Sequence, residues 1–108
     1  MSDTNEIQLK KGVLEMLVLA LLARRESYAY EIANELSELI GMGEGTIYPL
    51  MRRLQNDGLV KTYLMESSAG PSRKYYRLTQ QGRETLAAQR AQWDSFSAAI
   101  ITFLEQIG

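Results

Sequence analysis

Basic side chains gather in one stretch of this sequence of 108 residues. Between positions 46 and 79, six Lys and Arg residues stand against two acidic residues. The six are Arg52, Arg53, Lys61, Arg73, Lys74 and Arg77, and the two are Asp57 and Glu66. Guanidinium and ammonium groups gathered in this way can bind phosphates. Although the net charge of the whole chain is −1, its distribution therefore favours an anionic partner such as double-stranded DNA.

Side chains for catalysis and metal binding are scarce. The sequence contains no Cys and no His, which removes disulfides, thiolate nucleophiles, the usual zinc ligands and histidine acid–base chemistry. Glu31, Glu35 and Glu38 recur at helical spacing, which is typical of a hydrated surface rather than a metal site. The GMGEG segment at 41–45 lacks the Lys and hydroxyl that follow in a phosphate-binding P-loop. We therefore expect no enzyme activity, no metal and no cofactor.

One apolar run, from Val13 to Ala23, could be read as a membrane-spanning or export segment. It is about half as long as a bilayer requires. Glu15 interrupts the run, and Arg24 and Arg25 follow where an export signal needs small residues for cleavage. The run instead predicts a buried core helix. Since the chain also lacks Cys, we expect a cytoplasmic protein without a membrane partner.

These side chains need elements to position them, and the first half of the chain predicts three helices. Residues 9–25 combine strong helix formers with apolar residues on nearly every face, as in a helix contacted from several sides. A second helix over 28–40 has an apolar face, and Ser27 is its expected N-cap.

The third helix carries a core stripe at the spacing i, i+3, i+4, i+7, formed by Ile47, Leu50, Met51 and Leu54. Pro49 has no N–H and is tolerated best in the first turn, so this helix should begin near Gly45 or Thr46. Asp57 and Gly58 are expected to end it.

A β-hairpin and a long helix complete the chain. Residues 59–66 and 72–79 alternate polar with apolar or aromatic side chains, and SSAGPS at 67–72 predicts a six-residue tip. Thr79 is the expected N-cap of a helix that runs to about Gln106, weakened only by Gly82 in its first turn.

The last helix carries a long apolar seam. In one heptad frame, Leu86, Trp93, Ile100 and Ile107 occupy a positions, and Gln89, Phe96 and Phe103 occupy d positions. The small wing and short helices cannot cover a seam of this length. We therefore expect part of it to face a second copy of the chain in a homodimer.

The order helix, helix, turn, helix, hairpin, helix is that of a winged helix–turn–helix domain, mainly α with a small β-hairpin wing. We expect residues 1–79 to form this domain and residues 80–108 a C-terminal dimerisation helix, packed as one compact unit. In such a domain the third helix enters the major groove and the wing reaches nearby phosphates. The expected DNA contacts are Thr46, Tyr48, Arg52, Arg53, Arg73 and Lys74. Two alternatives stay open: Tyr48 packs against the sheet, or the arginine pair is an ordinary solvated surface.

Two blocks of the sequence resemble the PadR family of bacterial regulators. They are GTIYPLMRRLQNDGLV at 45–60 and RKYYRLTQQGRE at 73–84, separated by a short tip that contains glycine. The resemblance covers roughly residues 10–90. The single C-terminal helix is similar to that of a smaller PadR subgroup, which includes multidrug-sensing repressors.

The resemblance implies a homodimeric repressor whose first and last helices build the dimer interface. It implies the DNA contacts given above and adds Tyr28 and Tyr30, which match a pair often found near phosphates. Trp93 falls where multidrug-sensing members place a tryptophan that stacks against flat aromatic ligands. A small aromatic or hydrophobic effector would then bind at Trp93, with Phe96 and Ile100 as walls. The alternative is that Trp93 is simply interface core.

A second class of function stays open at this point. A winged helix can serve as a protein-binding module or antirepressor that never touches DNA. The acidic first 45 residues, with eight acidic and four basic groups, leave room for this interpretation.

Overall fold

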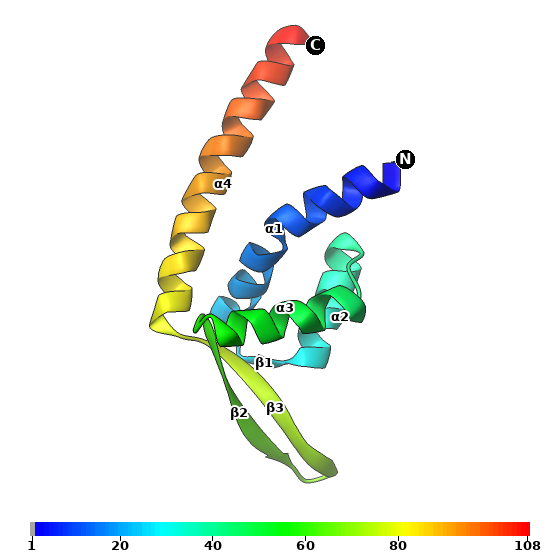
Figure 1. Cartoon of the computed structure of the whole chain (residues 1–108), viewed down its shortest axis with the longest axis vertical. Coiled ribbons are helices and arrows are strands. Elements are labelled where there is room, and N and C mark those ends of the chain that lie inside the picture. The colour runs from blue at the N-terminus through cyan, green and yellow to red at the C-terminus, as the bar shows by residue number, and fades with distance from the viewer. Residues whose placement is uncertain (1) are drawn as a thin grey trace.

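The computed structural model describes residues 2–108 along the backbone, with side chains described for residues 9, 10 and 13–108. These residues form seven elements (Figure 1): α1 (Ser2–Arg24), β1 (Ser27–Tyr28), α2 (Ala29–Ile40), α3 (Glu44–Asn56), β2 (Val60–Ser67), β3 (Gly70–Leu78) and α4 (Gln80–Ile107). The three strands form an antiparallel sheet in the order β1–β3–β2. The predicted fold class, mainly α with a small wing, is confirmed, and β1 is an additional strand.

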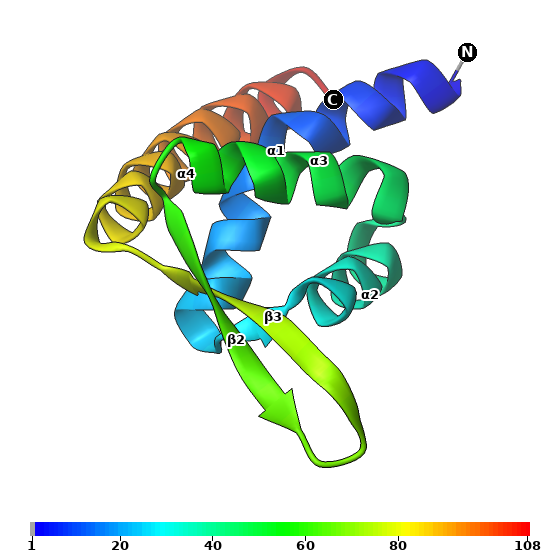
Figure 2. The same ribbon diagram turned by 60° about the horizontal axis from the view of Figure 1, so that its bottom comes forward.

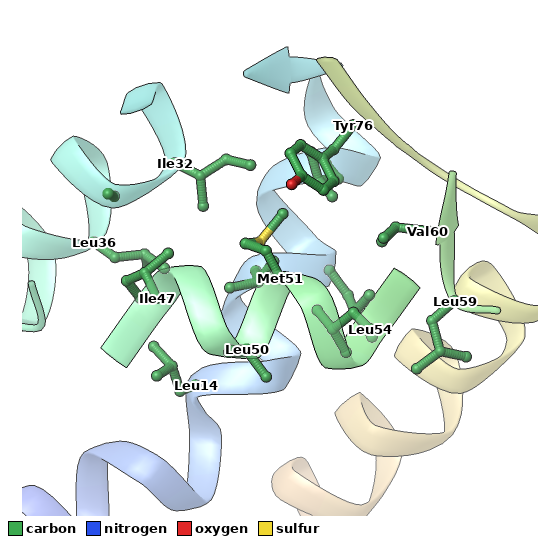
Figure 3. Packing of buried hydrophobic residues seen from close by; sticks show 14 of the residues in the cluster. Leu14, Ile32, Leu36, Ile47, Leu50, Met51, Leu54, Leu59, Val60 and Tyr76 are labelled. Carbon is green, nitrogen blue, oxygen red and sulfur yellow. The ribbon is translucent and has the colours of Figure 1, made fainter. Parts of the chain in front are cut away.

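A cluster of buried apolar side chains joins α1, α2, α3 and the base of the hairpin (Figure 3). From α1 it takes Leu14, Val18, Leu19 and Leu22, each at most 3% exposed. The prediction of a buried core helix in the apolar run is therefore confirmed. The helix begins earlier than predicted, at Ser2 instead of residue 9. Among the described residues, no helix is both long enough and apolar enough to cross a membrane.

The start of α2 differs from the prediction that Ser27 caps it. Ser27 lies in β1, opposite Tyr76 of β3, and its hydroxyl donates to the carbonyl of Arg25 at 3.1 Å. The N-cap is Tyr28, whose backbone N–H donates to the Glu31 carboxylate at 3.2 Å. Pairing with β3 holds residues 27 and 28 extended, so the helix begins at Ala29.

Helix α3 begins at Glu44, slightly earlier than predicted, and ends at Asn56. Pro49 is therefore the sixth residue and lies in the second turn, whereas it was expected in the first. Because proline has no N–H, the carbonyl of Gly45 lacks its usual helical donor. Gly45 is exposed, so water can reach that carbonyl. The predicted core stripe is confirmed, since Ile47, Leu50, Met51 and Leu54 are all buried.

The hairpin is longer, and its tip shorter, than predicted. Strands β2 and β3 pair from Val60↔Leu78 to Ser67↔Gly70, with a register shift between Met65 and Ser67. Two residues, 68 and 69, remain at the tip, so the prediction of a six-residue tip is wrong. The prediction relied on composition, because Ser and Gly are typical of loops. In the structure, backbone pairing between the strands continues into this segment, as far as Ser67 and Gly70.

Helix α4 is joined tightly to the hairpin base. Thr79 is its N-cap, as predicted: Thr79 Oγ1 accepts from the N–H of Gly82 at 3.0 Å and donates to the carbonyl of Gly58 at 2.7 Å. Gly82 is buried, and a Cβ at this position would lie 2.1 Å from the carbonyl oxygen of Leu59. Gly82, which was expected to weaken the helix, instead allows α4 to approach residues 57–59 this closely. These residues form the turn that precedes β2, which we call the β2 turn.

Beyond this junction, α4 packs on α1 and then projects away from the core. The ribbons of α1 and α4 separate toward the top of Figure 1, while the wing extends in the opposite direction. The molecule is consequently elongated, with extents of 58 × 32 × 21 Å.

Candidate nucleic-acid interface

Helix α3 lies in front of α1 and across the molecule from the tip of the wing (Figure 2). Its buried stripe faces the core, which leaves the other sides of the helix for the four residues predicted to contact DNA. The structure divides these four between two sides of the helix. Tyr48 and Arg52 are four residues apart and share one side, whereas Thr46 and Arg53 are seven residues apart and share another.

On the first side, Arg52 is exposed and Tyr48 is half-buried against the core. Burial raises the pKa of the Tyr48 phenol, and the nearby Glu44 carboxylate raises it further. Tyr48 thus packs in part against the core cluster, whose members include Tyr76 of the sheet. Arg52 forms no ion pair with any described side chain, so its guanidinium is available to an anionic partner.

On the second side, Arg53 is bound within the chain. Its Nη1 lies 3.0 Å from Oε1 of Glu15 on α1 and 3.7 Å from Oδ2 of Asp57. Thr46 lies on the same side and, with Glu15 and Arg53, lines a shallow hollow between α1 and α3. The two neighbouring arginines thus point to different surroundings, which their adjacency in the sequence does not reveal.

The two basic residues of the wing also point apart. Successive residues of a strand alternate between the faces of a sheet, so Lys74 and Tyr76 share one face of β3, and Arg73 and Tyr75 share the other. Tyr76 is paired with Thr62 of β2, whose hydroxyl accepts from Gln55 of α3 at 3.4 Å. The Lys74 face is therefore the one turned toward α3.

The opposite face of the three-stranded sheet carries a row of tyrosines that continues onto the start of α2. We call these four residues the tyrosine ladder: Tyr30 of α2, Tyr28 of β1, Tyr75 of β3 and Tyr63 of β2. Neighbouring rings along this ladder have centroids 6.4, 5.5 and 5.7 Å apart. The guanidinium carbon of Arg73 lies 4.7 Å from the centroid of Tyr28, in a cation–π contact. Tyr28 and Tyr30, predicted as phosphate neighbours, thus belong to a larger aromatic surface that also positions Arg73.

The far end of the ladder is anchored by a carboxylate. The Tyr63 hydroxyl donates to Oε1 of Glu26 at 2.7 Å. This hydrogen bond raises the pKa of Tyr63, and partial burial contributes a smaller increase. Sequence reasoning missed Tyr63 and Tyr75, because only the strand register places them opposite each other.

A second hollow, of about 320 Å³, lies between α1 and α4. It is lined by Val13, Glu15, Met16, Gln89, Gln92, Trp93 and Phe96. Two of the three predicted ligand contacts, Trp93 and Phe96, thus come together there. Ile100 is not among the lining residues; it lies one helical turn beyond Phe96.

The rest of α4 exposes an apolar surface along one side. We call it the α4 stripe: Trp93, Phe96, Ile100, Ile101, Phe103, Leu104 and Ile107, which are 40–67% exposed. Leu86, also predicted at the dimer interface, differs from these, because it is half-buried against the core of its own chain. The seam is thus divided: its first turn packs within the chain, and the remainder faces outward.

The acidic residues of α2 are partly neutralised by arginines at the end of α1. Arg24 lies 3.3 Å from Glu35, and Arg25 lies 3.7 Å from both Glu31 and Glu35. Among the described side chains, no group of three or more acidic residues is placed to bind a metal ion.

Comparisons with known proteins agree with this geometry. Residues 18–88 match the family model of the transcriptional regulator PadR-like family. A PadR-like transcriptional regulator from Bacillus cereus is 37% identical, with a TM-score of 0.83, over 90% of this chain and 96% of that one. A PadR family regulator from Eggerthella lenta is 34% identical, with a TM-score of 0.81, over 96% and 92% of the two chains. A protein from Lysinibacillus sphaericus is 30% identical over 88% of this chain and 91% of its own length.

Proposed function

Because the chain belongs to the PadR-like family of transcriptional regulators, we propose that it is a homodimeric repressor of transcription that binds double-stranded DNA. A protein with this role works where the chromosome lies, in the cytoplasm. It needs no catalytic activity, cofactor or metal.

The placement of Arg52 is the observation that carries the proposal. Its guanidinium is exposed on α3 and forms no ion pair with another described side chain. Lys74 is a second basic group, and it lies on the wing face that is turned toward the same helix. A helix that presents Arg to the major groove beside a wing that presents Lys to phosphates is the arrangement by which winged helices bind DNA.

Dimerisation is supported by the α4 stripe. Seven large apolar side chains in one helix are exposed in the single chain. Apolar surface of this size is usually covered in solution by a partner. We propose that residues 80–108 form the dimerisation helix, with Ile100, Phe103 and Ile107 in the interface and α1 contributing beside it.

Regulation by a ligand is supported by the hollow beside Trp93. Its volume of about 320 Å³ is at the lower end of the range for small-molecule sites. The faces of Trp93 and Phe96 can stack against a flat aromatic ligand. Such a ligand alters DNA binding only if it has different affinities for two arrangements of the dimer.

The protein-binding alternative rested on the acidity of the first 45 residues. Glu31 and Glu35 in that segment are paired with Arg24 and Arg25 of the same segment, and Glu15 is paired with Arg53 of α3. The segment keeps its excess of acidic residues, so the binding experiment below decides between the two functions.

Fluorescence anisotropy of a labelled duplex from upstream of the protein's own gene, against a scrambled duplex, tests the proposal. We expect Arg52→Ala to weaken binding by about ten-fold or more. Lys74→Ala removes two proposed phosphate contacts per dimer, so the slope of log affinity against log salt should become about 1.8 less negative in this variant. Arg83→Ala, an exposed arginine in the first turn of α4, is the matched control and should leave both quantities unchanged. Equal, weak binding of the native protein to every duplex tested would favour a protein partner instead.

A further inference from the structure

Glu15 of α1 contacts two other helices at once. Its Oε1 lies 3.0 Å from Nη1 of Arg53 on α3, and its Oε2 accepts from Nε2 of Gln89 on α4. The Glu15 side chain is only 24% exposed. It lines both the hollow beside Trp93 and the hollow beside Thr46. One carboxylate is thus shared between the helix proposed to read DNA and the helix proposed to form the dimer.

Gln89 connects this carboxylate to the surroundings of Trp93. The two residues are four positions apart in α4, so they lie on the same side of the helix, and both line the same hollow. Gln89 Oε1 is buried and has no hydrogen-bond partner among the described residues. A buried acceptor without a partner is unfavourable, so the Gln89 amide responds to any group that enters the hollow and can donate a hydrogen bond.

We propose that Glu15 is a positioning residue that couples the α1–α4 hollow to α3. The two oxygens of a carboxylate move together, so a displacement of Gln89 at Oε2 changes the geometry available to Arg53 at Oε1. Glu15 is largely withdrawn from water, which strengthens its interaction with the guanidinium. Coupling between sites is reciprocal, so a change at Arg53 also changes the surroundings of Trp93. The inference rests on the proposed function in one respect: the proposed function assigns DNA binding to α3.

The first arm of the test uses the free protein. Trp93 is the sole tryptophan, so acrylamide quenching reports on the hollow directly. We expect Arg53→Met to raise the quenching constant of Trp93, because the unpaired Glu15 turns toward water and Gln89 loses its acceptor. Arg52→Met, the adjacent arginine without a contact to Glu15, should leave the constant at the native value. In the background of Glu15→Gln, Arg53→Met should produce no further change, since residues of one network are not additive.

An unchanged constant in Arg53→Met, or additive effects of Arg53→Met and Glu15→Gln, would overturn the coupling. Circular dichroism of each variant confirms that its helices are intact, so that unfolding is not mistaken for coupling. The second arm adds the duplex and repeats the quenching. The native protein should show a change in Trp93 on binding DNA, and Glu15→Gln should bind DNA but lose that change. Failure of the native protein to bind any duplex would reject the proposed function, and the result of the first arm would stand by itself.

Discussion

Replacing Gly82 with alanine tests how the DNA-binding part of the chain is joined to α4. The added Cβ would lie 2.1 Å from the carbonyl oxygen of Leu59, and ordinary contact begins at 3.4 Å. The first turn of α4 and the β2 turn must therefore separate by more than 1 Å. That movement also stretches the bond from the N–H of Thr79 to the same carbonyl, now 3.1 Å. The clash is with backbone, which cannot rotate away as a side chain can.

The expected cost follows from these contacts. Overpacking costs about 1–3 kcal/mol, and weakening the Thr79 bond about 0.5–1.5 kcal/mol. Alanine regains about 1 kcal/mol through its better helix propensity. The net loss in the free energy of unfolding should be about 0.5–3.5 kcal/mol, with a midpoint of about 2 kcal/mol, and a loss of that midpoint size lowers the Tm by roughly 8–16 °C for a domain of this size.

Gly45 provides a matched control, because it also lies in a helix, but an added Cβ there would meet no described atom within 4 Å outside its chain neighbours and its own helix backbone. Gly45→Ala should raise the free energy of unfolding by up to about 1 kcal/mol. Both variants would be compared with the native protein by thermal and urea unfolding at one protein concentration, because the Tm of a dimer of the kind proposed would depend on concentration. If Gly82→Ala proved as stable as Gly45→Ala, the close approach of α4 to the β2 turn would be refuted.

Three further predictions address the dimer, the wing and the ladder. Phe103→Glu should convert the protein to monomers in sedimentation velocity; a persisting dimer would show that this part of α4 lies outside the interface. The hydrogen bond to Glu26 raises the pKa of Tyr63, so the neutral phenol stabilises the fold below about pH 10, and this contribution is lost as pH rises through the raised pKa. As the pH is raised above that value, the free energy of unfolding measured with urea should therefore fall less for Tyr63→Phe than for the native protein. An identical pH dependence in the two proteins would contradict the hydrogen bond to Glu26. Tyr28→Leu removes two cation–π contacts with Arg73 per dimer, each worth about 0.5–1 kcal/mol, so it should weaken DNA binding by about five- to thirty-fold. Tyr28→Phe should retain the binding, and equal losses in both variants would implicate the hydroxyl instead.

Local patterns in the sequence predicted most of the fold. The periodic stripe of α3, the Thr79 cap and the alternation in the hairpin depend on neighbouring residues, so they can be recognised without the tertiary structure. Strand β1 could not be recognised in this way. It has two residues, and only pairing with β3 makes it a strand, which is why Ser27 was expected to cap α2 instead.

The arrangement of the candidate site depended on long-range contacts. Arg52 and Arg53 are neighbours in the sequence, but Glu15, 38 residues before Arg53, pairs with Arg53 alone. Arg52 has no ion pair among the side chains that the structure describes. The available signal was a lone carboxylate inside an apolar run, which was interpreted only as evidence against a membrane segment. The tyrosine ladder needed the register of β2 against β3. Gly82 was read as a weak point of α4, because helix propensity carries no information about a neighbouring turn.

The outer part of the wing has a consequence for how this protein meets DNA. From Leu64 to Lys74 every residue except Ser67 is exposed, so this ribbon is held mainly by its own cross-strand pairs. Segments with few buried contacts open locally while the rest of the domain stays folded. The amide hydrogens of the ribbon should therefore exchange faster than those of Thr62 and Tyr76 at its base. In the proposed complex, fixing the ribbon on DNA would cost conformational entropy, and in return its tip could follow grooves of different width.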